Sequence, residues 1–592
     1  MLAHDMNSIL LLTIATKMLL GALENYKSSS KNPQTKSLHQ PLQTHYSLPM
    51  TPSKCDPNSG FDPQTRIFHS LRPPISLPPL TTPFSFPDYV SNLHDTHTSA
   101  ASLIHAPTRR RISLSDLPRL FRTLASNLSR RFHLSKGDVA FILSPNSIHI
   151  PILHLALLSL GVVVCPSNPL SSAAEISRQM FITRPAIAFA ASNCASKLPP
   201  LRLGTVLLDS PDFDSLLLPR SGPAESPVRA GVLQSDTAAI LFSSGTTGRV
   251  KGVELTHRNL VASVAAVRAV RSVRPSPAVT LCAVPFFHVY GFVLCLREVA
   301  LGGSMVVVDR AYLGTLLEAV EEFKVTHLAT APPTVVEMVK TEAALERFDL
   351  NLLEAVLCGG APLANSVVEK FKGRFGHVTL MQAYGLTETT GGITRMVDSK
   401  DSRVIGSNGR LSSNCEVKIV DPLIGHGLPP LEPGELWIRG PMVMKGSYVG
   451  DKEATKTMLE SDGWLRTGDI CYLDKQGYLF YVDRMKELIK YKGYQVPPAE
   501  LEDLLLSHPG IIDAAVIPLP DESAGQIPAA FVVRKLGCKV NESEIMNFVA
   551  QQVSPYKKIR KVFFIDSIPK NAPGKVLRKQ LTELASGIAS KL

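Results

Sequence analysis

Runs of apolar residues alternate with amphipathic stretches along most of the chain. Residues 139–143 form a short apolar run, 148–160 have the length and composition of a helix, and 162–165 form a second apolar run. This order predicts a strand–helix–strand unit whose two strands lie parallel in one sheet. Two further apolar runs are expected to continue that sheet, 187–190 and 205–208.

The same alternation continues through the middle of the chain. Residues 237–242 read as a buried strand, and Thr256 is a suitable N-cap for a helix that reaches Ala266. Further strands and helices are expected at 304–308, 316–330, 355–357 and up to Phe375. Residues 434–439 and 477–482 predict strands of a smaller β region. The expected fold class is therefore α/β, with a large N-terminal domain of parallel or mixed sheets, flanking helices and a β region.

The composition changes after Val482, where a short, charged region of mixed helices and strands begins. We place a domain boundary between Asp483 and Arg484, so that 59–483 form the large domain and 484–585 a small α+β C-terminal domain. At 592 residues the chain is too long for one hydrophobic core, which supports a division of this kind.

The two ends of the chain differ from its middle. Residues 1–58 become rich in Ser, Pro, Gln and Lys after Ala22, which predicts a disordered extension. The apolar run 9–22 is interrupted by Lys17 and makes a poor signal peptide. The last three residues, Ser590–Lys591–Leu592, match a tripeptide that a peroxisomal import receptor reads, so we expect a peroxisomal location.

The net charge of +11 raises the question of a nucleic-acid partner. Its densest part lies on one predicted helix, where six apolar residues share a face and the arginines lie elsewhere, which favours a solvated basic surface over a nucleic-acid groove. Nine scattered cysteines without a C-x-x-C pair fit a reducing compartment rather than a disulfide framework or a zinc site. No apolar run reaches eighteen residues, so we expect no transmembrane segment.

A loop rich in Ser, Thr and Gly follows the strand at 237–242 and carries the clearest chemistry. Its glycines let the backbone turn tightly with its amides close to an anion, its hydroxyls donate, and Lys251 adds a positive charge. The loop does not fit the G-x-x-x-x-G-K-[ST] pattern, because no hydroxyl residue follows the lysine directly. A Ser/Gly surface linker is the alternative, although it fits poorly with a loop attached to a buried strand.

This loop, S-S-G-T-T-G-R-V-K-G, resembles the signature of the adenylate-forming (acyl-activating) enzymes, and two further motifs of that family follow in the right order. Tyr384 to Glu388 read Y-G-L-T-E, and Thr467 to Asp469 read T-G-D. The resemblance extends over nearly everything from Gly60 onward and is closest to the plant 4-coumarate–CoA ligase-like group. It implies the adenylate-forming fold with a mobile C-terminal domain, and ATP, Mg²⁺ and coenzyme A as the partners of the reaction.

The resemblance also implies roles for individual positions. Tyr384 flanks the adenine, Thr387 contacts the α-phosphate and Glu388 helps to hold Mg²⁺, whereas Asp469 and Arg484 contact the ribose. The expected ATP or AMP site comprises Ser243, Ser244, Gly245, Thr246, Thr247, Gly248, Lys251, Gly360, Gln382, Ala383, Tyr384, Gly385, Thr387, Asp469, Arg484, Lys486, Lys490 and Lys575.

Several lysines in the C-terminal region acquire different roles from the same resemblance. Lys575 matches the lysine that serves adenylate formation, and Lys490 the one that serves thioester formation. Lys486 resembles the hinge position. Other positions, near coenzyme A or the catalytic site, are Arg310, Lys492, Gly493 and Gln495. Without the resemblance, lysines this frequent would indicate only a solvated face.

On the acid side, His288 and Tyr290 lie in P-F-F-H-V-Y and resemble the residues that gate or line the family's acyl pocket, together with Gly360. The pair Gly391–Gly392 after Glu388 departs from true hydroxycinnamate ligases and predicts a roomier wall. We therefore expect a fatty or cyclopentanone-bearing acid, resembling a jasmonate precursor, ahead of a hydroxycinnamate.

Three functions remain open at this point: an ATP-dependent acid–CoA ligase, a luciferase-like oxygenase and a non-catalytic acyl-binding protein. The matched coenzyme A positions favour the ligase over the oxygenase. The simultaneous presence of Lys251, Glu388, Asp469, Arg484, Lys490 and Lys575 speaks against a non-catalytic protein. We expect a monomeric ligase that acts on a small carboxylic acid.

Overall fold

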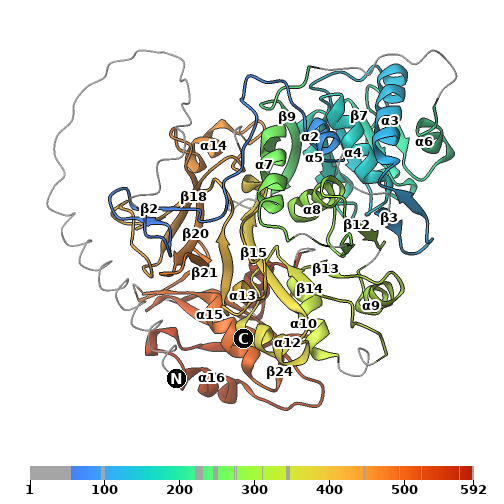
Figure 1. The fold of residues 1–592 in the computed structure, drawn as a ribbon. Helices are drawn as coiled ribbons and strands as arrows, with labels where there is room; N and C mark the ends of the chain where they lie inside the picture. The colour runs from blue at the N-terminus through green and yellow to red at the C-terminus, as the bar shows by residue number, and fades with distance from the viewer. Residues whose placement is uncertain are drawn as a thin grey trace.

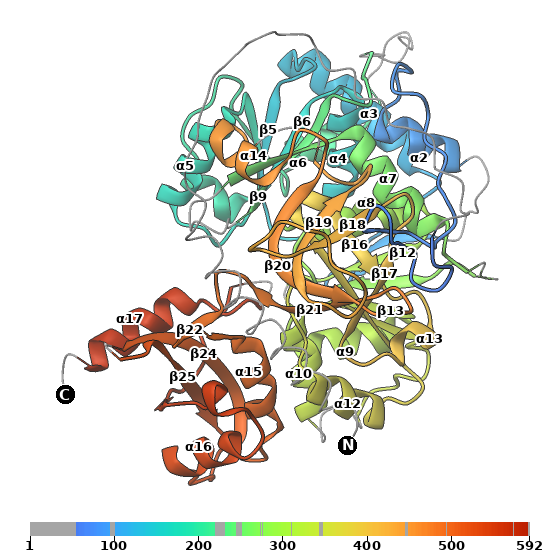
Figure 2. The same ribbon diagram turned by 90° about the vertical axis from the view of Figure 1, so that its left-hand side faces the viewer.

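The computed structural model describes residues 55–94, 101–219, 231–243, 251–272, 274, 276–309, 311–341, 347–444, 448–492, 494–521, 523–571 and 574–589. Three sheets organise these residues, with six, fifteen and five strands. Figure 1 shows the first two sheets with their helices as one large body. Figure 2 shows the C-terminal sheet, with α15, α16 and α17, as a smaller unit below it.

The six-stranded sheet has the order β10-β9-β6-β5-β7-β8. Its strands are β5 (Val139–Leu143), β6 (Val163–Ser167), β7 (Ile187–Ala190), β8 (Thr205–Leu207), β9 (Thr237–Ser243) and β10 (Lys251–Thr256). The predicted parallel arrangement is confirmed, because β5 pairs in parallel with both β6 and β7. Only β10 departs from it, pairing with β9 as an antiparallel hairpin.

The fifteen-stranded sheet has two halves that differ in strand direction. On one side lie β14 (Ala355–Cys358), β13 (His327–Thr330), β11 (Val279–Cys282), β12 (Ser304–Val307), β3 (Ser102–His105) and β4 (Arg111–Ser113). On the other lie β16 (Gly391–Arg395), β17 (Ser407–Leu411), β21 (Tyr478–Arg484), β20 (Leu465–Leu473), β19 (Gly434–Arg439), β18 (Glu416–Val420), β2 (Ile67–His69) and β1 (Phe61–Asp62). β15 (Thr379–Leu386) joins them, pairing in parallel with β14 and antiparallel with β16.

The strands expected at 434–439 and 477–482 form β19 and β21, within the antiparallel half of the large sheet. This half is the predicted β region, and it is continuous with the parallel half because β15 offers one edge to each. Residues 55–58 of the expected extension lie in the described part of the chain, where the backbone N–H of Asp56 donates to the carbonyl of Phe61 and that of Gly60 donates to the carbonyl of Asp56.

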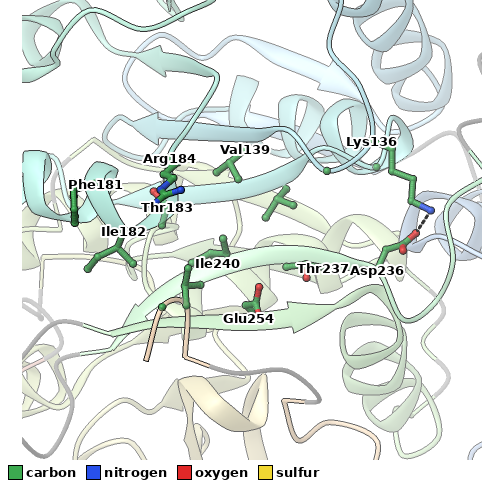
Figure 3. Close-up of a pocket in the computed structure, with 15 residues that line it drawn as sticks. Lys136, Val139, Phe181, Ile182, Thr183, Arg184, Asp236, Thr237, Ile240 and Glu254 are labelled. Atoms are coloured by element: carbon green, nitrogen blue, oxygen red, sulfur yellow. Dashed lines mark ion pairs between the residues drawn. The ribbon is translucent and has the colours of Figure 1, made fainter. Parts of the chain in front are cut away.

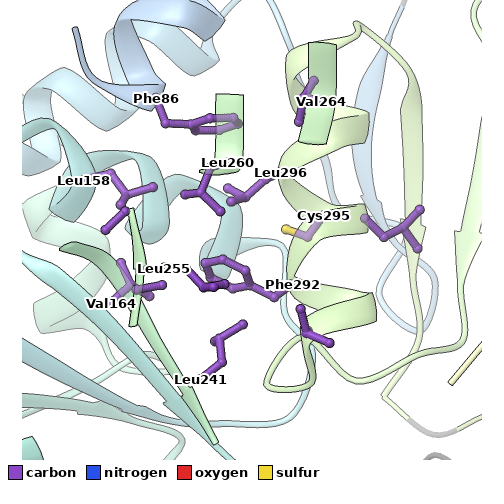
Figure 4. Close-up of a cluster of buried hydrophobic side chains, with 14 of the residues drawn as sticks. Phe86, Leu158, Val164, Leu241, Leu255, Leu260, Val264, Phe292, Cys295 and Leu296 are labelled. Atoms are coloured by element: carbon purple, nitrogen blue, oxygen red, sulfur yellow. The ribbon is translucent and has the colours of Figure 1, made fainter. Parts of the chain in front are cut away.

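One core lies between the two large sheets. The helices packed there include α2 (Phe86–His94), α4 (His149–Ser159), α7 (His257–Arg268) and α8 (Val289–Ala300). α4 carries apolar residues all round and is buried along its length, as expected for a helix covered on every side. Figure 4 shows Phe292 and Leu296 of α8 facing Leu158, Leu241 and Leu260.

The large body contains further helices. They are α3 (Leu117–Phe132), α5 (Ala173–Thr183), α6 (Pro211–Leu216), α9 (Leu313–Glu322), α10 (Pro332–Lys340), α12 (Asn365–Arg374), α13 (Ser399–Ser402) and α14 (Lys452–Met458). The predicted capping of α7 by Thr256 is confirmed, because the Thr256 side chain accepts the N–H of Asn259. The basic helix expected near residue 120 is α3, which buries Leu117, Leu124 and Leu128 and leaves its arginines exposed.

The C-terminal unit has its own sheet and core. Its strands are β22 (Ile489–Tyr491), β23 (Tyr494–Val496), β24 (Ile511–Asp521), β25 (Gly525–Arg534) and β26 (Lys561–Phe564), and its helices are α15 (Pro498–Ser507), α16 (Glu542–Ala550) and α17 (Arg578–Ala589). It contacts the large body through polar groups: Ser366 of α12 donates to Asp503 of α15 at 3.3 Å, and Lys340 of α10 donates to the carbonyl of Ile512. Among the described residues, no helix is both long and apolar enough to cross a membrane.

Candidate active site

The β9–β10 hairpin fixes both ends of the predicted phosphate loop. Ser243, the last residue of β9, is the register partner of Lys251, the first residue of β10. The loop positions between them, Ser244, Gly245, Thr246, Thr247 and Gly248, lie outside the described residues. Lys251 is buried, with its ammonium 4.5 Å from the centre of the Tyr448 ring, a cation–π contact that orients the side chain.

Glu388 lies at the same end of the hairpin, on a single turn of 3-10 helix, Thr387–Thr389. Its Oε1 accepts hydrogen bonds from the Ser243 hydroxyl at 3.2 Å and the Tyr448 hydroxyl at 2.8 Å. Burial and the neighbouring carboxylate raise the pKa of Tyr448, so the phenol keeps its proton and donates. A buried carboxylate held in this way beside a phosphate-loop hairpin is a suitable oxygen ligand for Mg²⁺.

Glycine permits the tight turn that presents Glu388. Gly385 and Leu386 pair with Gly392 and Gly391 across the hairpin. A Cβ on Gly385 would lie 1.8 Å from the carbonyl oxygen of Gly391, and Gly391 itself has a φ of +88°. The Thr389 hydroxyl closes the turn by donating to the Gly391 carbonyl at 2.8 Å.

A second cluster forms around Asp469, which is 1% exposed. Asp469 on β20 is the register partner of Arg484 on β21, and the Tyr384 hydroxyl donates to its Oδ2 at 2.6 Å. Its Oδ1 lies 3.1 Å from Nε of Arg484, yet it accepts no hydrogen bond within the described part of the chain. Burial raises the pKa of Asp469, and the Arg484 guanidinium opposes that shift. A buried carboxylate oxygen with spare accepting capacity fits a ribose hydroxyl.

Lys575 reaches this second cluster from the C-terminal unit. Its Nζ lies 3.4 Å from Oε1 of Glu487, and the other oxygen of Glu487 lies 3.1 Å from Nε of Arg578. Burial and the charge of Arg484 lower the pKa of Lys575, whereas Glu487 and Asp469 raise it. The carboxylates of Asp469 and Glu487 thus lie among three cationic side chains, with Lys575 close to the predicted ribose site.

The loop that carries Lys575 is seated against the large body. Gly574 has a φ of +87°, and a Cβ there would lie 2.6 Å from Cδ of Pro333, at the start of α10. The Asn571 side chain holds the loop from within, since its Oδ1 accepts the backbone N–H of Lys575 at 2.8 Å. A glycine before the lysine is therefore a steric requirement of this arrangement.

Lys490 lies elsewhere on the same unit. It is exposed on β22, and its backbone N–H bonds to Oε1 of Gln526 at 2.8 Å. Gln495, its register partner on β23, is half-buried, and Lys492 and Lys486 are exposed. Arg310 and Gly493 lie outside the described residues. The structure therefore brings Lys575 to the Asp469 cluster and leaves the side chain of Lys490 in solvent.

On the acid side, His288 caps α8 and accepts the backbone N–H of Tyr290 at 3.3 Å. Burial lowers the pKa of His288 to about 4, so its ring is neutral at neutral pH. The Tyr290 hydroxyl donates to the carbonyl of Leu357 at 2.8 Å, and its ring covers Gly359, next to Gly360 in a turn with a φ of +93°. Gln382 and Ala383 precede Tyr384 on β15.

Next to His288 along the chain, Phe286, Val289 and Phe292 belong to the buried core between the sheets. Beside Gly392 lies Arg395, whose Nη2 donates to the Gly392 carbonyl at 2.7 Å and whose Nε donates to the Ser412 hydroxyl at 3.4 Å. Burial and the charge of Arg297 lower the pKa of Arg395 to about 10.

Four residues near the site lie outside the motifs quoted above. Tyr448 belongs to the Glu388 cluster, Glu487 and Arg578 belong to the Asp469 cluster, and Arg395 lies on the acid side. Glu487 was the easiest of them to predict from the sequence, because a single acidic residue between Lys486 and Lys490 suggests an ion-pair partner for a cation. Tyr448 and Arg578 gave no local signal, since their contacts join segments 60 and 91 residues apart.

A separate cavity of about 700 Å³ lies at the other end of β9. Figure 3 shows the Lys136–Asp236 ion pair at one side of it and Phe181 to Arg184 at the other. None of the predicted site residues lines this cavity. Thr237, the first residue of β9, lines it, whereas the phosphate loop follows Ser243, the last residue of β9.

Comparisons with known proteins agree with this geometry. Residues 94–448 match the family model "AMP-binding enzyme", and residues 500–575 match "AMP-binding enzyme C-terminal domain". The chain is 48% identical over 553 residues to 4-coumarate–CoA ligase-like 9 of Arabidopsis thaliana, covering 91% of this chain and 98% of that protein. It is 42% identical over 540 residues to peroxisomal OPC-8:0-CoA ligase 1 of the same plant, covering 89% and 98%.

Solved structures lead to the same family. ATP-bound MatB from Rhodopseudomonas palustris superimposes with a TM-score of 0.76 at 26% identity, covering 85% of this chain and all of that one (100%). MenE from Bacillus subtilis, in complex with ATP and a magnesium ion, gives a TM-score of 0.71 at 26% identity, covering 83% and 98%. The chain therefore belongs to the AMP-binding enzyme family and is an AMP-forming acyl-CoA ligase of the 4-coumarate–CoA ligase-like kind.

Proposed function

We propose that this ligase works in two half-reactions that use opposite faces of its C-terminal unit, residues 484–585. In the first, a carboxylic acid and ATP give an acyl-AMP and pyrophosphate; in the second, coenzyme A displaces AMP to give the thioester. The observation that carries the proposal is the placement of Lys575 beside Asp469 and Arg484 while Lys490, on the same unit, is exposed to solvent. This arrangement would serve the first half-reaction.

In that step the acid's carboxylate oxygen attacks the α-phosphorus, and the bond to the pyrophosphate oxygen breaks. Negative charge builds on the phosphate and is met by fixed donors and cations. Lys575 would bridge the incoming carboxylate and the phosphate, and Thr387 would donate to a phosphate oxygen. Asp469 would accept the ribose hydroxyls, with Tyr384 against the adenine. When bound, Mg²⁺ at Glu388 supplies further positive charge to the phosphates.

In the second step the C-terminal unit would rotate about Lys486 and present Lys490 to the acyl-AMP. The coenzyme A thiolate then attacks the acyl carbon, and AMP leaves with the electron pair of the broken C–O bond. Gln495, Lys492 and Gly493 would accompany Lys490, and Arg310 would meet a coenzyme A phosphate. Ser366–Asp503 is one of the polar contacts that hold the C-terminal unit in the first arrangement, and such contacts can be exchanged when the unit rotates.

For the acid, we propose an oxygenated fatty acid with a keto group, such as a cyclopentanone-bearing acid, in the peroxisome. Its apolar chain would pass the Gly391–Gly392 wall, and its distant oxygen would meet the Arg395 guanidinium. Arg395 supports an oxygen-bearing chain because its described partners are neutral acceptors, which leaves its charge available. The name of the relative OPC-8:0-CoA ligase and the tail Ser590–Lys591–Leu592 support the same choice.

A panel of acids tests this proposal. Pyrophosphate release is measured for octanoate, longer fatty acids, keto fatty acids, cinnamate and 4-coumarate, each with and without coenzyme A, and thioester formation is followed separately. We expect the keto fatty acids to give the highest kcat/KM and coenzyme A to be consumed. A clear preference for 4-coumarate would favour a hydroxycinnamate ligase. Turnover of the adenylate by oxygen without coenzyme A would favour an oxygenase. If no acid gave pyrophosphate release, a non-catalytic acyl-binding protein would be favoured.

A further inference from the structure

The first described residues fold back onto the edge of the large sheet at a glycine. Gly60 has a φ of +75°, and a Cβ there would lie 2.2 Å from the carbonyl oxygen of His69. The His69 N–H donates to the Gly60 carbonyl at 2.8 Å, and β1 pairs with β2 as an antiparallel hairpin. This close approach brings Cys55, which precedes the hairpin, next to side chains of both strands.

Three potential metal ligands meet there. The Cys55 thiol, the Asp62 carboxylate and the His69 imidazole each place a ligand atom within 4.8 Å of the other two. Asp62 is buried, while Cys55 and His69 are half-buried, so the cluster is open to solvent on one side. One oxygen of Asp62 accepts the backbone N–H of Gln64 at 2.9 Å, which fixes the carboxylate within the turn.

A fourth side chain holds the imidazole in the way that metal-bound histidines are held. Glu416 on β18 is the register partner of His69, and its Oε1 lies 3.2 Å from Nδ1 of that ring. The other oxygen of Glu416 accepts from Nε and Nη2 of Arg439, at 2.8 and 2.6 Å. A carboxylate on one ring nitrogen fixes the ring and makes the other nitrogen a better ligand. This contact is independent of the clustering and points to the same use.

We propose that Cys55, Asp62 and His69 bind one zinc-like divalent transition-metal ion, with Glu416 as the positioning residue for His69. One sulfur, one nitrogen and one carboxylate oxygen form a donor set that suits Zn²⁺ and discriminates against Mg²⁺ and Ca²⁺, which prefer oxygen. Tetrahedral S, N and O ligands of Zn²⁺ lie about 3.3–3.6 Å apart. Because each pair of the three atoms lies within 4.8 Å, no pair needs to approach by more than about 1.5 Å. The thiol proton leaves to solvent on binding, and water takes the fourth position.

Such an ion would fasten the β1–β2 hairpin to β18, at an edge of the large sheet. The ligands belong to neither the Glu388 nor the Asp469 cluster, so the ion would stabilise the fold without entering the ligase reaction.

Cobalt titration tests the site in the full-length protein. Co²⁺ bound by a thiolate gives an intense charge-transfer absorption that oxygen and nitrogen ligands do not give. We expect this band to saturate at one ion per chain, to disappear in Cys55→Ser and to need at least tenfold more Co²⁺ in His69→Ala. Cys538→Ser is the matched control, because Cys538 is also a half-buried cysteine, and it should retain the band.

Zinc competition and thermal melting complete the test. Zn²⁺ should displace Co²⁺ and raise the melting temperature of the wild type and of Cys538→Ser, but not that of Cys55→Ser. Glu416→Gln should weaken Co²⁺ binding while keeping the band, since it removes the positioning carboxylate and no ligand. The proposal fails if the wild type gives no thiolate–cobalt band, or if Cys55→Ser gives the same band as the wild type.

Discussion

Replacing Lys575 by alanine separates a catalytic role of this lysine from a structural one. The ion pair that it forms with Glu487 spans 3.4 Å between side chains that are 36% and 24% exposed, so solvent screens it. A pair of this kind contributes at most about 1 kcal/mol to folding. Glu487 also keeps its contact with Arg578 after the substitution. The melting temperature should therefore fall by no more than about 2 °C.

The loss of rate should be much larger. Removing one positioned donor at a developing charge slows an enzyme by about 10²- to 10³-fold, or about 3–4 kcal/mol in the barrier. We expect a decrease of that size in pyrophosphate release from acid and ATP, with thioester formation from supplied acyl-AMP close to wild type. Lys490→Ala should show the reverse, and its stability should be unchanged because its side chain is exposed.

Lys570→Ala supplies the matched control for these measurements. Lys570 belongs to the same unit and pairs with Asp513 at 2.6 Å, with side chains 29% and 27% exposed, so its structural contribution resembles that of Lys575. It should leave both half-reactions unchanged. If Lys575→Ala and Lys490→Ala slowed the same half-reaction, the use of opposite faces by the two lysines would be refuted. Equal losses in Lys570→Ala would show that the effect is structural.

Three further changes probe other parts of the molecule. Arg395→Met should lower kcat/KM for keto fatty acids about tenfold while leaving that for unsubstituted fatty acids within about twofold, since one charge-assisted hydrogen bond is lost; equal losses for both classes would exclude contact with the acid's distant oxygen. His154 is fully buried, no described residue bonds to either ring nitrogen, and burial lowers its pKa from 6.5 to about 3. The unfolded chain therefore protonates His154 below about pH 6.5, whereas the folded protein does so only near pH 3, and the free energy of unfolding falls as the pH drops between these values. His154→Leu removes this proton uptake and two unsatisfied ring nitrogens, so it should raise the denaturation midpoint and flatten its acid dependence; an unchanged pH profile in urea would contradict this. Deleting residues 590–592 should leave a tagged protein in the cytosol with normal activity, and continued peroxisomal import would point to another signal.

Much of the fold was predictable because apolar periodicity is a local property. β5 and β19 have the predicted bounds, and α7 begins at its predicted cap. The connection between the two halves of the large sheet was not predictable, since β15 runs through the polar residues of the Tyr384 motif, where the alternation is weak. Arg484, placed at the start of the C-terminal domain, is the last residue of β21 in the structure.

The residues of the candidate site also divide into those that the sequence predicted and those that it did not. Motifs located Glu388, Asp469 and Lys575, because each lies in a short segment with its own composition. Their partners come from elsewhere: Tyr448 reaches Glu388 from 60 residues away, and Arg578 reaches Glu487 from 91 residues away. No spacing rule links such pairs, because their proximity is a product of the complete sheets. The phosphate-loop residues between Ser243 and Lys251 were predicted from composition, and that prediction stays open.

The order of strands in the large sheet has a consequence for how the chain is made. Phe68 on β2 pairs with Val417 on β18, a residue that the ribosome adds 349 positions later. At about 5–20 residues per second, Phe68 waits about 20–70 s for its partner. During that time the unpaired strands β1 and β2 leave the ribosome with open hydrogen-bonding edges, which are prone to aggregation. Synthesis of this protein should therefore depend on chaperones that shield its first hairpin until residue 417 has emerged.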